Sequence, residues 1–120
     1  MTSSAETLLA VQLEQAGIPF EREVRFAAIL GRKWRADFLA ASPAWPKGNP
    51  ILHSPVLVEI DGGAFVGGRH SRGTGVEKDA EKQSAAAILG YRVIRLTPAQ
   101  VADGRGLTWI KQALGLEQAA

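Results

Sequence analysis

The sequence predicts an α/β domain in which helices flank a mixed four-stranded sheet. The first observation is the order of elements along the chain, αβββαβα, which follows from the changing period of its apolar residues. The second is a short, strongly apolar strand at 56–61, typical of a strand buried on both faces. The third is the helix that connects this strand to the next one, since such a crossover helix is typical of an α/β sandwich.

Length and composition narrow the class of protein. The chain has 120 residues, which fits one domain over 1–120. It is 46% hydrophobic and 22% charged, which excludes disorder as the main state. No apolar run is long enough to span a bilayer, and the first residues lack the basic and apolar regions of a secretory signal. We therefore expect an intracellular, cytoplasmic protein with no membrane partner.

The chain contains no cysteine, which excludes disulfides, thiolate zinc sites and cysteine nucleophiles. Its formal net charge is +2, too small by itself to indicate a nucleic-acid partner. The basic residues are, however, concentrated in two segments, 22–35 and 67–73. Such local basic surface either supports contact with a phosphate backbone or only solvates loops.

The first elements are a helix and a hairpin. The helix is expected over 4–16, because Ser3 and Glu6 fit a capping box and apolar residues follow at helical spacing. Strands are expected over 20–29 and 34–40, with a turn at 30–33. In the second strand, alternation predicts one face made of Trp34, Ala36, Phe38 and Ala40, and the other made of Arg35, Asp37 and Leu39.

Two segments are expected to lack regular structure. Residues 41–55 contain four prolines, which cannot donate backbone hydrogen bonds. Residues 62–75 contain six glycines. The remaining elements are a helix over 76–89, a strand over 91–96, a short helix capped by Thr97-Pro98 and broken at Asp103-Gly104, and an amphipathic helix over 107–114.

Three acids lie on strands that should be neighbours: Asp37, and the pair Glu59 and Asp61 at the end of the apolar strand. Strand side chains repeat every two residues, so Glu59 and Asp61 share a face. Unpaired carboxylates near a sheet interior are costly, and oxygen ligands suit Mg²⁺ or Mn²⁺. The alternative is that the acids face water or pair across the sheet with Arg25, Arg35 or Arg92.

The order of these pieces resembles the PD-(D/E)XK nuclease superfamily over about residues 4–97. The pieces that carry the resemblance are RADFLA (35–40), VLVEIDGGAF (56–65), GGRHSRGTGVEKDAEKQ (67–83) and GYRVIRLTP (90–98). They look like small phage and bacterial members of the group that contains Vsr-type mismatch endonucleases, MutH and archaeal-type Holliday junction resolvases. The resemblance implies a restriction-endonuclease-like αβββαβ core, here followed by a C-terminal helix.

The sequence departs from the plain motif of this superfamily at two positions. Ala36 replaces the proline before the acid, a change of little consequence because the acid is the ligand. Asp61 occupies the position of the motif lysine, two residues after Glu59. Similar families place the amine on the following helix, where Lys82 is the candidate and Lys78 and Gln83 are reserves. The alternative is that Lys82 is an ordinary exposed helix lysine.

The resemblance also implies roles for individual residues. Asp37, Glu59 and the carbonyl of Ile60 would bind Mg²⁺ or Mn²⁺, and Asp61 would act on a second metal or on water. Lys82 would hold the attacking hydroxide or neutralise the scissile phosphate. Glu6 either contributes to the metal site or only caps its helix. The other expected contacts are His70, as a general acid or base, a phosphate contact or an exposed loop residue, and a DNA-binding set of Arg32, Lys33, Arg35, Arg69 and Arg72.

The sequence therefore predicts a metal-dependent DNA endonuclease acting in recombination or repair on branched or damaged DNA. A Holliday junction resolvase would work as a homodimer, because it cuts two opposed strands. A Vsr-like nicking enzyme is the alternative within the fold. Two further alternatives are a non-catalytic nucleic-acid-binding module and a small structural protein whose acids form salt bridges.

Overall fold

A computed structural model of the 120-residue chain describes residues 3–47, 52–61 and 73–116. The described segments contain a four-stranded sheet and four α-helices, together with one short 3-10 helix. Their bounds are α1 (Ser4–Gln15), β1 (Phe20–Val24), η1 (Ala28–Leu30), β2 (Ala36–Ala40), β3 (Val56–Ile60), α2 (Gly73–Ile88), β4 (Arg92–Leu96), α3 (Pro98–Ala102) and α4 (Arg105–Ala113).

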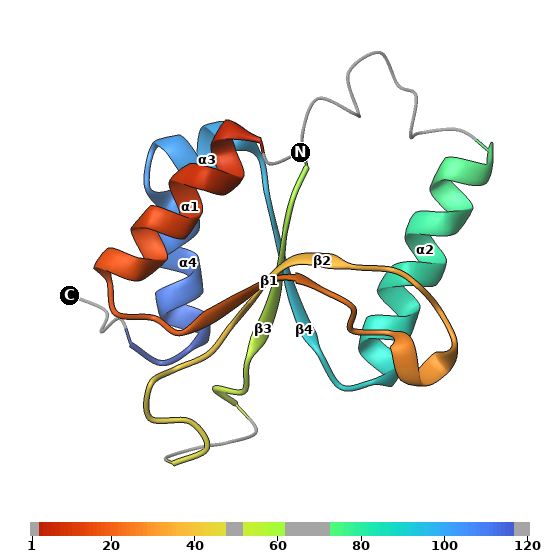
Figure 1. The fold of residues 1–120 in the computed structure, drawn as a ribbon, viewed down its shortest axis with the longest axis horizontal. Helices are drawn as coiled ribbons and strands as arrows, with labels where there is room; N and C mark the ends of the chain where they lie inside the picture. The colour runs from red at the N-terminus through yellow and green to blue at the C-terminus, as the bar shows by residue number, and fades with distance from the viewer. Residues whose placement is uncertain (1–2, 48–51, 62–72, 117–120) are drawn as a thin grey trace.

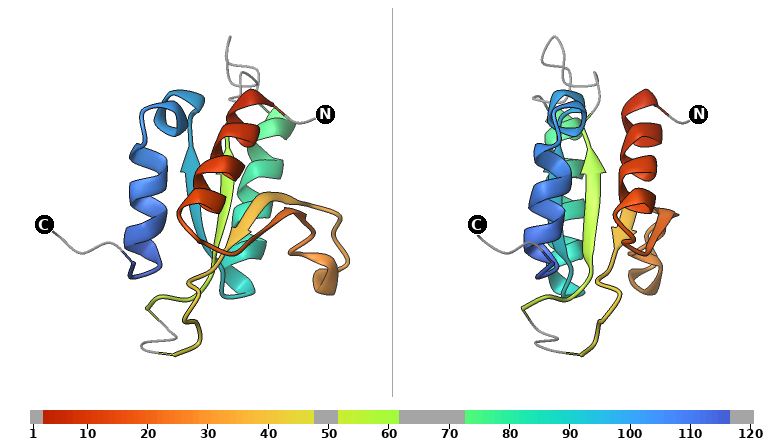
Figure 2. Two further views of the ribbon diagram at one scale, coloured as in Figure 1. Left: turned by 60° about the vertical axis from the view of Figure 1, so that its left-hand side comes forward. Right: turned by 90° about the vertical axis from the view of Figure 1, so that its left-hand side faces the viewer.

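The sheet lies between two helical layers. Figure 1 shows α1, α3 and α4 on one side of the sheet and α2 on the other, and the two turned views of Figure 2 show the same helices around it. Each layer encloses its own hydrophobic cluster against the sheet. The α/β class is therefore confirmed.

The sheet is mixed, as the sequence predicts. Its strand order is β1-β2-β3-β4, with β1–β2 and β2–β3 antiparallel and β3–β4 parallel. The parallel pair is joined through α2, the crossover helix. Strand β3 is consequently central, and its first three residues, Val56, Leu57 and Val58, are buried.

The larger cluster fills the space between the sheet and the three helices α1, α3 and α4. Phe38 of β2 lies at its centre with no exposed surface, and its ring centroid is 5.7 Å from that of Phe20. The other buried members are Leu9, Ala10, Leu13, Ile18, Ala40, Val56, Val58, Leu96, Val101, Ile110 and Leu114. This cluster fixes α1, and with it Glu6, against the sheet.

The smaller cluster lies under α2 and corrects the expected face of β2. Trp34 and Ala36 pack here, on the α2 side with Leu57, whereas Phe38 and Ala40 belong to the α1 side. The prediction that all four share one face is wrong. Trp34 precedes the strand and so does not follow its alternation. Ala36 is at the strand end, where the twist of a strand turns side chains relative to its middle.

Strand β1 is shorter than expected, which is a second correction. It ends at Val24 rather than at residue 29. Glu23 has a φ of 54°, in the left-handed region that non-glycine residues seldom adopt, and the Phe26 amide donates to the Val24 carbonyl at 3.0 Å. The chain therefore leaves the sheet early and crosses to β2 through η1 and Gly31.

The remaining boundaries differ less from the sequence predictions. Helix α2 already includes residues 73–75, ahead of the start expected at Val76. Thr97 and Gln100 form the capping box of α3, and Gly104, with a φ of 88°, separates α3 from α4. Helix α4 runs over 105–113 rather than 107–114.

Replacing Phe38 tests this arrangement of the core. Phe38→Ala should lower the free energy of unfolding by about 3–5 kcal/mol, because a fully buried aromatic side chain leaves a cavity. Urea denaturation followed by circular dichroism measures the change. Leu52→Ala is the control, since Leu52 is mostly exposed and should cost less than about 0.5 kcal/mol. Equal losses for both variants would contradict the assigned core.

The link between α3 and α4 gives a prediction about pH. The side chain and backbone amide of Arg105 donate to Asp103, at 2.9 and 3.0 Å, and these hydrogen bonds hold the Asp103 pKa below its ordinary value of 3.8. The pair therefore stabilises the folded state above about pH 4, and this stabilisation is lost as the pH falls through the folded-state pKa. NMR titration should show the Asp103 pKa rising toward 3.8 in Arg105→Gln, whereas Arg22→Gln should leave it unchanged.

Candidate functional site

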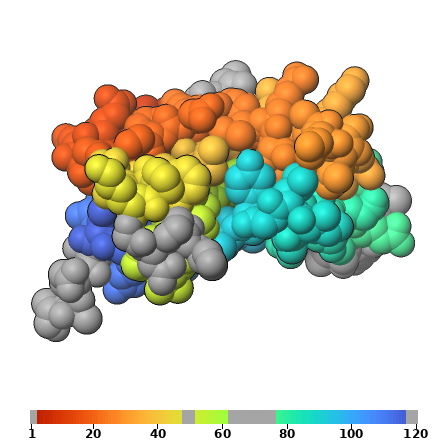
Figure 3. All heavy atoms as spheres, turned by 90° about the horizontal axis from the view of Figure 1, so that it is seen from below, coloured from red at the N-terminus to blue at the C-terminus, as the bar shows by residue number. Residues whose placement is uncertain are grey.

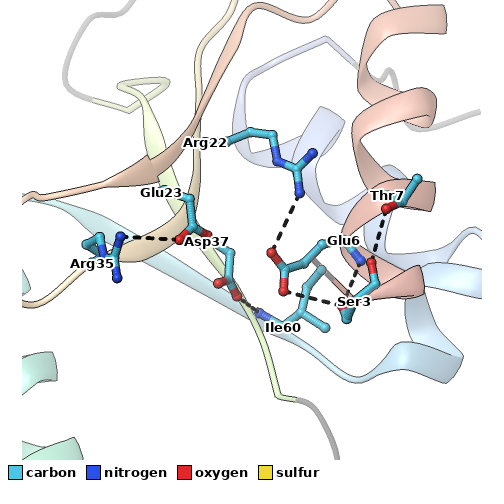
Figure 4. A network of polar contacts seen from close by, with 8 residues as sticks. All are labelled: Ser3, Glu6, Thr7, Arg22, Glu23, Arg35, Asp37 and Ile60. Carbon is cyan, nitrogen blue, oxygen red and sulfur yellow. Dashed lines mark hydrogen bonds and ion pairs between the residues drawn. The ribbon is translucent and has the colours of Figure 1, made fainter. Parts of the chain in front are cut away.

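Two of the predicted acids, Asp37 and Glu59, lie where β2 and β3 stop pairing. Asp37 and Glu59 are the next residues beyond the last paired residues, Phe38 and Val58. The Asp37 carboxylate accepts a hydrogen bond from the Ile60 backbone amide at 2.8 Å, which fixes it to the end of β3 (Figure 4). Main-chain pairing therefore places residues 22 or 23 positions apart in the sequence at one end of the sheet.

Asp37 belongs to a cluster of three carboxylates with Glu6 and Glu23. One oxygen from each lies within 4.8 Å of the others. Glu6 comes from the first turn of α1, and Glu23 comes from β1. Two arginines flank the cluster, Arg22 at 3.7 Å from Glu6 and Arg35 at 3.6 Å from Glu23 (Figure 4). These cations offset part of the repulsion among the carboxylates.

Glu6 combines the two roles that the sequence left open, helix capping and membership of the acidic site. The Glu6 backbone amide donates to the Ser3 hydroxyl at 3.1 Å, and that hydroxyl donates to the Glu6 carboxylate at 3.3 Å. Ser3 is thus the N-cap of α1. The second Glu6 oxygen faces Arg22, so capping leaves part of the carboxylate directed toward the acidic cluster (Figure 4).

Glu23 is the member that sequence reasoning missed. The alternating pattern placed it among the outward residues of an expected strand, where charged side chains are common. Glu23 lies in the cluster and has a left-handed φ of 54°. A glutamate seldom adopts this conformation, so its residue type does not predict it. No pattern in the sequence marks this residue.

Glu59 forms an ion pair with a lysine that α2 supplies. The ammonium group of Lys82, on α2, donates to the Glu59 carboxylate. The pair is largely enclosed, with 15% of the Glu59 side chain and 23% of the Lys82 side chain exposed. Lys78, one turn earlier on α2, is exposed. The structure thus brings Lys82, the preferred sequence candidate, to the end of β3.

Asp61 is bound to a cation that the sequence reasoning did not select. An Arg95 guanidinium nitrogen lies 2.7 Å from the Asp61 carboxylate. This hydrogen bond raises the pKa of Arg95, and the negative charges of Asp61, Glu59 and Asp79 add to the effect. Glu59 and Asp61 therefore share the α2 face of the sheet, as expected, and Asp79 of α2 lies near them.

The cross-sheet partners proposed for the three acids need correction. In the described structure Arg35 pairs with Glu23, and Arg92 donates to Ser54 and to the Ala113 carbonyl. Burial lowers the pKa of Arg92. Sequence spacing did not reveal these pairs, because they depend on the end of β1 and on the position of α4.

The expected DNA-binding residues divide into two groups. Arg32 lies 3.9 Å from the ring centroid of Trp34 and 3.8 Å from Glu81, and Arg35 pairs with Glu23. Lys33 is exposed. Arg69, His70 and Arg72 lie outside the described residues, so their place relative to the acids stays a prediction.

Carboxylate oxygens from three elements form a donor set that suits a hard divalent cation such as Mg²⁺ or Mn²⁺. In the described segments this set is Glu6, Glu23 and Asp37, and Glu59 is not among its members. Glu59 and Lys82 form a second, adjacent polar unit on the α2 side. Near the end of β3 the described structure therefore brings together the carboxylates of Glu6, Glu23 and Asp37 and, beside them, the ammonium group of Lys82 bound by Glu59.

Comparison of the chain with protein-family models, curated proteins and solved structures finds no match. Within the described residues, no helix has the length and apolar character needed to cross a membrane.

A double-mutant cycle tests the contact between Glu59 and Lys82. Glu59→Gln, Lys82→Met and the double variant should give a coupling energy of about 1 kcal/mol or more, since the pair is largely enclosed. Urea denaturation supplies the free energies of unfolding. The matched cycle with Lys78→Met should give almost no coupling. Equal coupling energies in the two cycles would contradict a specific contact between Lys82 and Glu59.

Proposed function

We propose that the protein is a metal-dependent DNA endonuclease with a restriction-endonuclease-like core, acting on branched or damaged DNA. The observation that carries the proposal is the meeting of Lys82 with Glu59 at the end of β3, beside the backbone-bound Asp37. The PD-(D/E)XK resemblance requires two acids and an amine there, and this chain lacks the lysine of the plain motif. The contact supports the idea that α2 supplies the amine instead.

The metal of the proposal is Mg²⁺ or Mn²⁺, and the donor chemistry fits it. Asp37 would hold the ion, aided by Glu6 and Glu23, whose oxygens lie within 4.8 Å of one another and of Asp37. Glu59 and the Ile60 carbonyl are the further ligands that the resemblance implies. When bound, such an ion lowers the pKa of a coordinated water and offsets charge on the phosphate.

Lys82 would supply the fixed positive charge of the reaction. Its ammonium group is held by Glu59 and is largely screened from water, so its electrostatic effect on a phosphate is stronger than that of an exposed lysine. It would neutralise the scissile phosphate or hold the attacking hydroxide. Asp61 would then position Arg95 on the α2 face of the sheet, where Lys82 also lies. The Asp61 carboxylate accepts a hydrogen bond from the Arg95 guanidinium.

Two non-enzymatic alternatives are favoured by the same ion pairs. Glu59 and Asp61 are both neutralised within the chain, by Lys82 and Arg95, so they need no metal. A nucleic-acid-binding module on this fold would keep the basic segment near Lys33 without cutting DNA. A small structural protein would use the pairs only for stability.

A cleavage assay separates these functions. Labelled four-way junction, flap, mismatched and linear duplex DNA are incubated with Mg²⁺, with Mn²⁺ or with chelator. We expect metal-dependent cleavage that Asp37→Asn abolishes and that Lys82→Met lowers by a factor on the order of 100. Lys78→Met is the matched control and should retain full activity, because Lys78 is exposed one turn away.

The pattern of products identifies the class of nuclease. Symmetric cutting of the junction indicates a resolvase, and nicking at the mismatch indicates a Vsr-like enzyme. Binding without cleavage in either metal would contradict the nuclease and leave the binding module. Neither binding nor cleavage would favour the structural protein.

A further inference from the structure

A pocket of about 270 Å³ lies between α2 and β4, on the face of the sheet that α2 covers. Its lining residues are Gln83, Ala87, Tyr91, Val93 and Arg95. Two of them, Gln83 and Val93, also line a small neighbouring cavity that Glu59 and Lys82 help to form. The pocket therefore adjoins the Glu59–Lys82 ion pair. We call it the α2–β4 pocket.

Tyr91 gives the α2–β4 pocket an aromatic wall with a fixed position. This residue precedes β4 and is half-buried, and its ring meets that of Phe26 edge to face, with 6.1 Å between the ring centroids. Phe26 belongs to the β1–β2 connection, which Figure 3 (orange) shows beside the end of α2 and the start of β4 (cyan). Ala87 and Val93 add apolar surface. Such walls suit a planar ring, which can stack on the aromatic side chain.

The pocket also has polar groups that the chain itself leaves available. Within the described residues, the Gln83 side-chain amide and the Tyr91 hydroxyl form no hydrogen bond. An amide side chain carries a donor and an acceptor together, and it can bind the edge of a nucleobase such as adenine through two hydrogen bonds. Gln83 is therefore placed to recognise the edge of a ring that stacks in the pocket.

The charge around the pocket disfavours an isolated anion as its ligand. Arg95 is bound to Asp61 at 2.7 Å, and Lys82 is bound to Glu59. The negative charge of Asp79 also acts on Arg95. Among these groups the carboxylates outnumber the cations, so an anion in the pocket would meet net repulsion. A neutral ring with hydrogen-bonding groups on its edge suits the pocket better, and a nucleobase is such a ring.

We propose that the α2–β4 pocket binds one unstacked nucleobase of the DNA substrate, in the nucleotide next to the scissile phosphate. Tyr91 stacks against the base, and Gln83 hydrogen-bonds its edge. The inference rests on the proposed nuclease, because the nearness of Lys82 to the pocket is what relates the base to the scissile phosphate.

Such a pocket determines which DNA the protein selects. In an intact duplex each base is stacked and paired, and turning it out of the helix costs free energy that is smallest at a mismatch or in a single strand. Branch points, flaps and mismatches offer a base at lower cost. The pocket thus gives a physical reason for a preference for branched or damaged DNA, which the acids and Lys82 alone do not supply.

Binding without cleavage tests the pocket. Fluorescence anisotropy with the Asp37→Asn chain in Mg²⁺, which should not cut DNA, measures the affinity for a duplex with one mismatched pair and for the same duplex fully matched. We expect at least tenfold tighter binding of the mismatched DNA. Adding Gln83→Ala should lower this preference at least fivefold and leave the affinity for matched DNA unchanged.

Gln112→Ala is the matched control, since Gln112 is exposed on α4, and it should keep the full preference. Failure to bind either DNA, equal affinities for the two DNAs, or an unchanged preference after Gln83→Ala would overturn the proposal.

Photo-cross-linking locates the base and separates this proposal from the nuclease. The mismatched base is replaced by 5-iodouracil, which bonds to an adjacent aromatic side chain on irradiation, and mass spectrometry identifies the linked residue. We expect a cross-link to Tyr91 that excess unlabelled mismatched DNA prevents and excess adenosine does not. Equal competition by adenosine would mean that a free nucleoside is the ligand and would overturn a DNA base as the occupant.

The two proposals fail separately in this experiment. A cross-link outside the pocket, with metal-dependent cleavage by the wild type, would overturn the pocket and leave the nuclease. A cross-link to Tyr91 without cleavage in Mg²⁺ or Mn²⁺ would support the pocket and contradict the nuclease.

Discussion

The burial of β3 on both faces joins the two helical layers through one strand. Val56 and Val58 pack against the cluster under α1, α3 and α4, and Leu57 packs against the cluster under α2. The strand is buried at Val56, Leu57 and Val58 and becomes partly exposed at its C-terminal end, where Glu59, Ile60 and Asp61 follow. In the described part of the chain, carboxylates and cations from α1, β1, β2, α2 and β4 gather around this end of the strand.

The charges at this end are balanced by cations from β1, from the connection between η1 and β2, from α2 and from β4. Arg22 of β1 pairs with Glu6, and Arg35 pairs with Glu23. Lys82 of α2 pairs with Glu59, and Arg95 of β4 pairs with Asp61. Pairing reduces the cost of holding carboxylates near a sheet interior. It also means that the proposed metal would compete with these cations, above all where Glu59 is bound to Lys82.

Residue type and spacing predicted the helix caps and the crossover, because these features depend on neighbouring residues in the sequence. The cap at Ser3, the Thr97-Pro98 start of α3 and the crossover after β3 all follow from residue type and spacing. Lys82 followed from the resemblance, which required an amine on the helix after the acidic strand. The end of β1 and the place of Glu23 were not predictable, because they depend on a left-handed backbone that tertiary packing selects.

Binding of Mn²⁺ to the full chain is the most direct test of a metal site at Asp37, because it needs no substrate. Electron paramagnetic resonance or calorimetry would follow the titration of the wild type and of Asp37→Asn, with Glu14→Gln as a matched control on the exposed face of α1. We expect saturable binding that Asp37→Asn weakens at least tenfold and Glu14→Gln leaves unchanged. Absence of saturable binding, or equal affinity in all three proteins, would contradict a metal site at the end of β3.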